Sequence, residues 1–182
     1  MDIREIETDL SNKLSKKRFI HTLGVVNSAI YLAQKYGVNV EDAHLAALLH
    51  DCAKEIPLIE MRDLVADLSC DEDMLQSGAL LHGLAGMVLA NNQYGVTNPH
   101  ILEAIRVHTT GKEKMSKLDK IIFLADYIEP NRNFPGVNDI RLAAEDSLDA
   151  GVLCGFDMTI RHLLDSGDSI YPLTILSRND LL

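Results

Sequence analysis

The chain has 182 residues, a length that suits one domain or one domain with a small appendage. Its formal net charge of −10, with no basic stripe, argues against nonspecific binding to nucleic acid or to an anionic membrane surface. An acidic protein that handles phosphates must supply positive charge locally, from metal ions and a few Lys or Arg side chains.

Cysteine usage and the lack of a targeting segment predict a cytoplasmic location. The three cysteines are an odd number with no CxxC spacing, which favours reduced thiols. Residues 1–7 lack the long apolar segment of a signal peptide, and no apolar run reaches the length of a membrane span. We therefore expect a cytoplasmic protein that binds neither membrane nor nucleic acid.

Apolar residues recur at helical spacing along nearly the whole chain. Capping signals add boundaries, with Gly37 as a C-cap, Asn98 and Ser116 as N-caps, and residues 71–73 as a solvated helix start. The predicted helices cover residues 2–14, 17–36, 39–53, 58–68, 82–94, 99–109, 116–128, 139–149, 152–165 and a short segment after Pro172. Because no strand alternation, repeat or long linker interrupts this series, the sequence predicts one all-α domain over residues 1–182, with roughly eight to ten helices.

An imidazole and a carboxylate stand side by side where an apolar helix ends. His50 and Asp51 follow the mostly apolar residues 44–49, and desolvating an unpaired carboxylate in such a place is costly. A metal ion would offset that cost and give both side chains a role. Further candidate ligands lie along the chain at His21, His82, His108 and Asp126. Because ligands from different helices can converge on one ion inside a bundle, this ordered series predicts a metal site.

Each further candidate also has an ordinary structural explanation, which the sequence leaves open. His21 could be a core histidine whose ring is satisfied by neighbouring groups. His82 could start a helix, and His108 could end one, where an imidazolium suits the helix dipole. Asp126 lies in an apolar run and could pair with Arg132 instead of a metal.

Six short segments carry motifs beyond the candidate ligands themselves. They are Lys17–Val25, His50–Lys54, His82–Gly83, His108–Gly111, Ala125–Arg132 and Phe134–Val137. The ordered ligand series resembles that of the HD-domain metal-dependent phosphohydrolases, and its two extra histidines resemble the dinuclear branch. The segments resemble the YqeK-type proteins, a family of symmetrical diadenosine-tetraphosphate hydrolases. This resemblance implies a single HD domain with its metal-site core at residues 17–137 and a helical tail at residues 138–182.

The resemblance implies two transition-metal ions. Neighbouring helical residues point about 100° apart, so His50 and Asp51 can share an ion only near a helix end. The implied ligands are His21, His50, Asp51 and Asp126 for one ion, and His82, His108 and a bridging Asp51 for the other. Mixed imidazole and carboxylate ligands suit iron, manganese, cobalt or zinc, and the resemblance favours iron.

The reaction that the resemblance implies is symmetrical cleavage of diadenosine tetraphosphate (Ap4A) to two ADP. Two ions can lower the pKa of a bridging water and supply hydroxide, which would attack an inner phosphorus. Asp51 would help to orient that water, and Lys54 would help to neutralise the phosphoryl charge. The implied substrate contacts are Arg18, Lys54, Thr109, Tyr127, Asn131 and Arg132.

Other functions stay open at the level of sequence. The chain could be an HD-type phosphohydrolase of mononucleotides or cyclic nucleotides, although the GYP motif of the cyclic-dinucleotide branch is absent. It could also be a module that binds metal or nucleotide without turnover. The oligomeric state is equally open, with a homodimer as one outcome.

Overall fold

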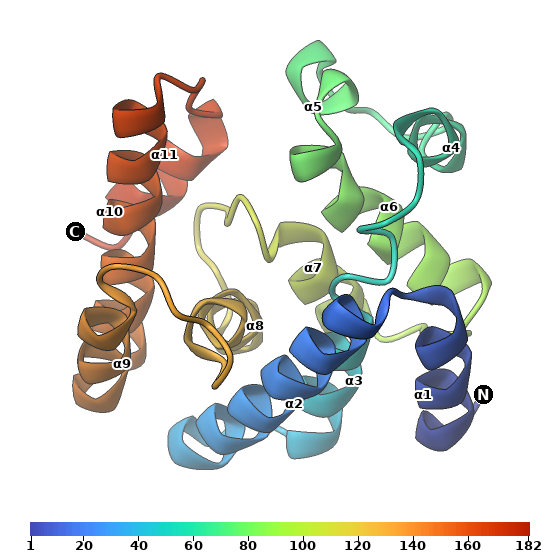
Figure 1. Ribbon diagram of the computed structural model, residues 1–182, viewed down its shortest axis with the longest axis horizontal. Helices are drawn as coiled ribbons and strands as arrows, with labels where there is room; N and C mark the ends of the chain where they lie inside the picture. The colour runs from blue at the N-terminus through green and yellow to red at the C-terminus, as the bar shows by residue number, and fades with distance from the viewer.

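The computed structural model describes residues 1–182 as eleven α-helices without a strand (Figure 1). The helices are α1 (Ile3–Lys13), α2 (Lys16–Tyr36), α3 (Val40–Leu49), α4 (Leu58–Leu64), α5 (Glu72–Gln76), α6 (Gly78–Asn92), α7 (Pro99–Val107), α8 (Lys117–Ile128), α9 (Val137–Asp146), α10 (Leu148–Ser166) and α11 (Pro172–Asn179). The all-α prediction is confirmed, but the count exceeds the predicted eight to ten. None of these helices is both long and apolar enough to cross a membrane.

Capping side chains explain where several helices begin. Asn39 accepts a hydrogen bond from the backbone of Asp42 at the start of α3. Ser116 and Asp119 form a reciprocal capping box at the start of α8. The N-cap of α5 is Asp71, so the acidic stretch begins a helix as predicted.

Two predicted boundaries near the candidate ligands are wrong. The third helix was expected to continue to about Ala53, but α3 ends at Leu49. Its last turn is broken because the His50 ring lies 2.6 Å from the Ala47 carbonyl oxygen, which a continuing helix would use for the backbone of Asp51. The sixth helix begins at Gly78 rather than at residue 82, so His82 lies in its second turn and does not start the helix.

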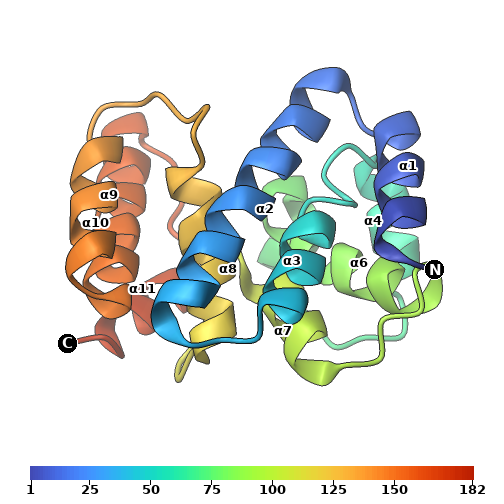
Figure 2. The same cartoon turned by 90° about the horizontal axis from the view of Figure 1, so that it is seen from below.

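Helices α2, α3, α7 and α8 form the centre of the molecule (Figure 2). Helices α9, α10 and α11 flank α8 on one side, while α1, α4 and α6 lie on the other. Small side chains let the central helices approach closely: Ala29 and Ala33 of α2 and Ala43 of α3 are fully buried. A Cβ on Gly83 of α6 would lie 2.6 Å from the carbonyl oxygen of Arg106 in α7, so glycine is required for that contact.

The C-terminal helices are fastened to the centre by an aromatic contact. Phe123 of α8 and Phe156 of α10 are fully buried, and their ring centroids are 4.3 Å apart. We expect Phe156→Ala to lower the free energy of unfolding by about 3–5 kcal/mol, because the substitution leaves a cavity in a packed interior. Urea denaturation would measure the loss. Leu142→Ala, at a side chain that is 70% exposed, should change it by less than about 0.5 kcal/mol.

Candidate metal centre

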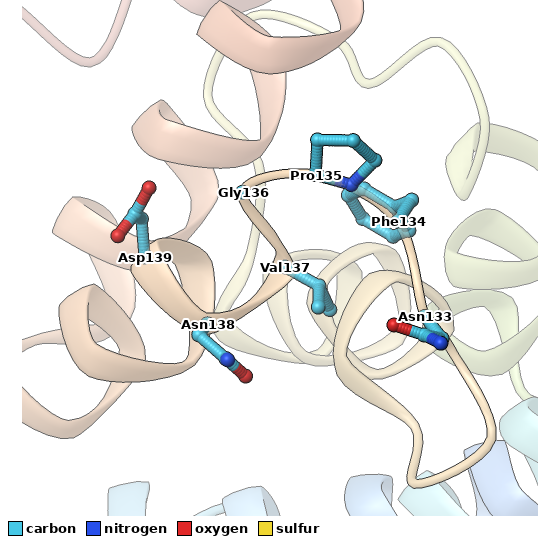
Figure 3. A pocket seen from close by; sticks show the side chains of 7 residues that line it. All are labelled: Asn133, Phe134, Pro135, Gly136, Val137, Asn138 and Asp139. Carbon is cyan, nitrogen blue, oxygen red and sulfur yellow. The ribbon is translucent and has the colours of Figure 1, made fainter.

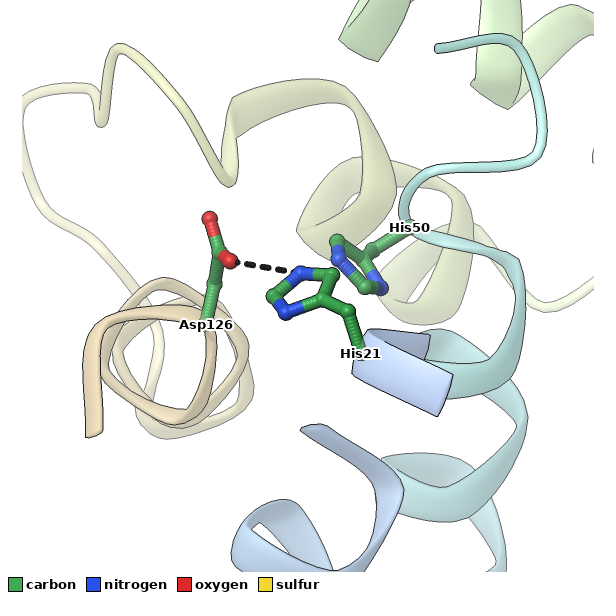
Figure 4. A group of neighbouring side chains, drawn as sticks. All are labelled: His21, His50 and Asp126. Carbon is green, nitrogen blue, oxygen red and sulfur yellow. Dashed lines mark ion pairs between the residues drawn. The ribbon is translucent and has the colours of Figure 1, made fainter. Parts of the chain in front are cut away.

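The six predicted ligands come together in one buried cluster. They are His21 of α2, His50 and Asp51 after α3, His82 of α6, His108 at the end of α7 and Asp126 of α8. Figure 4 shows the His21 ring between His50 and Asp126, with an ion pair that joins Asp126 of α8 to His21 of α2. The four imidazoles follow one another, with ring centroids 5.6, 5.1 and 4.8 Å apart from His21 through His50 and His108 to His82.

The two carboxylate oxygens of Asp51 face different parts of this cluster. Oδ1 lies 3.3 Å from Nε2 of His82 and 3.6 Å from Nε2 of His108. Oδ2 lies 3.6 Å from Nε2 of His50 and 3.8 Å from Nε2 of His21. A single buried carboxylate therefore stands between two pairs of imidazoles, the position that a bridging ligand requires.

All four histidines turn the same nitrogen outward, away from the centre of the cluster. Each Nδ1 lies beside an oxygen that can accept a proton-bearing nitrogen. The acceptors are Glu129 for His21 at 3.2 Å, the Ala47 carbonyl for His50 at 2.6 Å, the Gly78 carbonyl for His82 at 3.2 Å and the Ile105 carbonyl for His108 at 2.7 Å. These contacts favour the Nδ1–H tautomer, so the Nε2 lone pairs converge on the centre.

The converging lone pairs have too few hydrogen-bond donors. Nε2 of His50 is buried without a hydrogen-bond partner, and Nε2 of His21 faces an Asp126 carboxylate oxygen at 3.0 Å, which has no proton to donate. Nε2 of His82 and Nε2 of His108 lie only 2.9 Å apart. His21 lies between two carboxylates, Glu129 at Nδ1 and Asp126 at Nε2, so its contacts fit either a charged core histidine or a metal ligand.

The donor set fits metal ions. Ligand atoms of His21, His50 and Asp126 lie within 4.8 Å of one another, as do those of His50, Asp51 and His108. Imidazole nitrogens and carboxylate oxygens are ligands for transition metals, and a cation would engage lone pairs that now face one another. The cluster therefore has the residues to hold divalent metal.

At four groups of the cluster the protonation state suits coordination, whereas at His21 burial is outweighed by contacts with Asp126 and Glu129, which raise its pKa. Burial lowers the pKa of both His50 and His82 to about 4, so both rings are neutral at pH 7. Burial alone would raise the pKa of Asp51, but the histidines around it hold that pKa well below its usual value. Burial would likewise raise the pKa of Asp126, but the contact with His21 outweighs burial and lowers the pKa of this carboxyl. Neutral imidazoles and ionised carboxylates are the forms that bind metal.

Three cationic side chains border the cluster. Arg18 Nη1 lies 2.7 Å from Asp51 Oδ2, and Lys54 Nζ lies 3.2 Å from His82 Nε2. Arg132 binds the Asp126 carboxylate, as one structural explanation predicted, yet the same carboxylate oxygen also lies 3.0 Å from His21 Nε2. Lys54 is not on the helix of His50, because α3 ends at Leu49. The turn at residues 50–55 brings Lys54 to the cluster instead.

The other predicted substrate contacts are placed differently. Thr109 Oγ1 lies 3.2 Å from His82 Nε2, at the cluster. Asn131 is exposed, and its side-chain amide donates to the Glu129 carboxylate. The Tyr127 hydroxyl lies 2.5 Å from Thr159 Oγ1 of α10, so this group is directed to a neighbouring helix and not to the histidines.

Glu129 is a member of the cluster that the sequence did not assign. It follows the last residue of α8, is 2% exposed, and contacts Nδ1 of His21. An acidic residue at a helix end is normally solvated, so residue type and position gave no sign of its burial. The signal that was available is its place in the motif of residues 129–132.

The residues directly after Arg132 line an open hollow of about 530 Å³ (Figure 3). Residues 133–139 line it, and none of the six predicted ligands does. The hollow is therefore separate from the histidine cluster in its lining, although Arg132, which contacts Asp126, directly precedes it in the chain.

The chain is similar to known proteins over most of its length. The HD domain family profile matches residues 18–131. A symmetrical bis(5'-nucleosyl)-tetraphosphatase of Halalkalibacterium halodurans is 44% identical, over 93% of this chain and 91% of its own length. A protein of the same description from Bacillus subtilis is 37% identical, over 100% and 98%. A crystal structure described as a predicted HD superfamily hydrolase involved in NAD metabolism, from Clostridium acetobutylicum, superposes with a TM-score of 0.96 at 40% identity, covering 100% of this chain and 97% of that one.

Proposed function

The chain belongs to the HD domain family and, within it, to the symmetrical bis(5'-nucleosyl)-tetraphosphatases, and from this membership we propose that it hydrolyses Ap4A to two ADP. The observation that carries the proposal is the convergence of four imidazole Nε2 atoms on the two oxygens of Asp51. A site of this composition is suited to phosphoanhydride hydrolysis.

Two ions would be shared among the six clustered side chains. His21, His50, Asp51 and Asp126 would hold one, and His82 and His108 the other, with Asp51 common to both. When bound, such ions lower the pKa of water and withdraw charge from phosphoryl oxygens. Iron is the metal that the family resemblance favours, while the ligand types also suit manganese, cobalt or zinc.

The cationic side chains supply the charge that a polyphosphate needs. The chain is acidic overall, so binding a substrate with several phosphate charges depends on local cations. The Arg18 and Arg132 side chains are 28% and 37% exposed, whereas the histidines behind them are buried. This arrangement places guanidinium groups between solvent and the cluster, where each can exchange a carboxylate contact for a phosphoryl oxygen. Lys54, nearer to His82, would hold charge that develops at the reacting phosphate.

The remaining sequence predictions belong to this proposal. Thr109 and Asn131 are proposed to contact the substrate from two sides of the cluster, and Tyr127 through its ring, since its hydroxyl is engaged by Thr159. A single domain over residues 1–182 and a cytoplasmic location also remain predictions. So does the absence of nucleic-acid and membrane partners, with a homodimer as one outcome for the oligomeric state.

A substrate panel tests the proposal against its alternatives. The purified chain would be supplied with Mn²⁺ or Fe²⁺ and assayed on Ap4A, deoxynucleoside monophosphates and cyclic dinucleotides. We expect kcat/KM for Ap4A to exceed that for the others by at least about 10²-fold. The reason is that paired contacts of guanidinium groups with a polyphosphate strengthen its binding by several factors of about ten. Preference for a mononucleotide or a cyclic nucleotide would favour another HD-type phosphohydrolase. Binding without turnover of any of these would favour a sensing module.

A further inference from the structure

We infer that Glu129 is a positioning residue, which holds the His21 ring so that its Nε2 faces the metal site. The inference rests on the metal site of the proposed function. It assigns a role to Glu129, which is not one of the six proposed ligands, and it explains why residue 24, one turn after His21 on α2, is a glycine. Glu129 is buried to 2% exposure at the end of α8, and its Oε1 lies 3.2 Å from Nδ1 of His21. A carboxylate behind a ligating histidine fixes both the tautomer and the ring orientation.

The second oxygen of Glu129 is fixed by its own neighbours. Oε2 accepts the backbone N–H of Asn131 at 2.7 Å and its side-chain amide at 3.1 Å. The backbone is held too, because the Arg141 guanidinium donates to the carbonyl oxygens of Glu129, Ile128 and Arg132. The carboxylate therefore has little freedom to leave His21.

Gly24 provides the space that this carboxylate occupies. It lies one turn after His21 on α2, and a Cβ built on it would come within 2.4 Å of Glu129 Oε2 and 3.2 Å of the carboxyl carbon. No real side chain tolerates the shorter distance. Any residue larger than glycine would displace the carboxylate. The contact between Glu129 and His21 therefore depends on residue 24 as well as on residue 129.

Glu129→Gln is the first test. A glutamine side chain has one acceptor oxygen and one NH₂ group, whereas the His21 N–H and the Asn131 N–H both require an acceptor. One of the two contacts is lost in either orientation of the amide. Mn²⁺ would be titrated into the full-length, chelator-treated chain by calorimetry. We expect binding of one ion, the one that His21, His50, Asp51 and Asp126 would hold, to weaken about 10–100-fold, with binding of the other ion retained.

Gly24→Ala tests the same contact from the opposite side. It should weaken Mn²⁺ binding in the wild-type background, because it displaces the Glu129 carboxylate. It should have no further effect in a Glu129→Ala background, since nothing remains to displace. This non-additivity is expected of two residues that act through one contact. A variant that only loosened the fold would instead give additive losses in the double variant.

The outcomes separate the inference from the proposed function. Asp157→Asn, which breaks an ion pair with Arg178 on α10 and α11, is the matched acid-to-amide control and should bind Mn²⁺ like wild type. If wild type binds no Mn²⁺, the proposed metal site is wrong. If wild type binds Mn²⁺ and both Glu129→Gln and Gly24→Ala match its affinity, the metal site stands and the positioning role is overturned. The comparison is made on variants whose metal-free circular dichroism matches wild type.

Discussion

Asp51→Ala should reduce Ap4A hydrolysis by about 10³-fold or more and should lower the metal content of the purified chain. Asp51 is the only carboxylate whose two oxygens face both pairs of imidazoles, His21 with His50 and His82 with His108. Its removal would leave the two pairs of imidazoles without the carboxylate ligand that they would share. The helices should persist, because Asp51 lies in a turn after α3 and caps no helix.

The measurements are initial rates, elemental analysis and far-ultraviolet circular dichroism on one preparation. Asp51→Asn adds a variant of nearly equal volume, which separates loss of charge from loss of packing. Asp149→Ala is the control, because it removes an acid whose side chain is 64% exposed and paired with Lys120. That control should retain full rate and metal. Full activity of Asp51→Ala would rule out a bridging role for this carboxylate.

Removal of metal is expected to abolish turnover and to lower the thermal unfolding midpoint. Nε2 of His50 is buried without a hydrogen-bond partner and Nε2 of His21 faces a carboxylate oxygen, so a cation that engages both nitrogens binds the folded chain in preference to the unfolded chain. A ligand at 100 times its Kd adds about 2.7 kcal/mol to stability, which is about 5–10 °C in a chain of this size. Differential scanning calorimetry would compare chelated protein with protein resupplied with Mn²⁺ or Fe²⁺.

Recovery of both rate and midpoint on adding metal back would distinguish metal removal from damage by the chelator. Asp51→Ala serves as the internal control, since its midpoint should respond less to metal than that of wild type. A chelated chain with unchanged rate and unchanged midpoint would argue for chemistry without metal.

Sequence patterns predicted the helices well, because helix formation depends on local signals, and the six candidate ligands do lie in one cluster. Apolar spacing and caps such as Asn39 and Ser116 act within a few residues, so they located the start of α3 and both ends of α8 closely. The pairing of His50 with Asp51 after an apolar run was informative since burial of an acid demands a partner. The very short helix α5 shows why the number of helices was underestimated, because five residues are too few for a clear helical periodicity.

Features that depend on tertiary contacts could not be predicted in the same way. The end of α3 is set by a ring-to-carbonyl contact of His50, so the turn that follows lay outside what the helix pattern predicted. The burial of Glu129 depends on Gly24 of a helix more than one hundred residues away in sequence. Likewise, the orientation of the Tyr127 hydroxyl follows from the position of Thr159 in α10. These are contacts between elements, and one sequence alone gives no distance between them.

Product analysis of Ap4A hydrolysis tests the central claim most directly. The metal-supplied chain would be incubated with Ap4A to partial conversion, and the nucleotides separated by anion-exchange chromatography. Attack at an inner phosphorus that breaks the central bridge consumes one water and yields two ADP, so ADP should be the sole product at two per Ap4A consumed. Equal amounts of AMP and ATP would mean that a different bond is cut and would contradict the account.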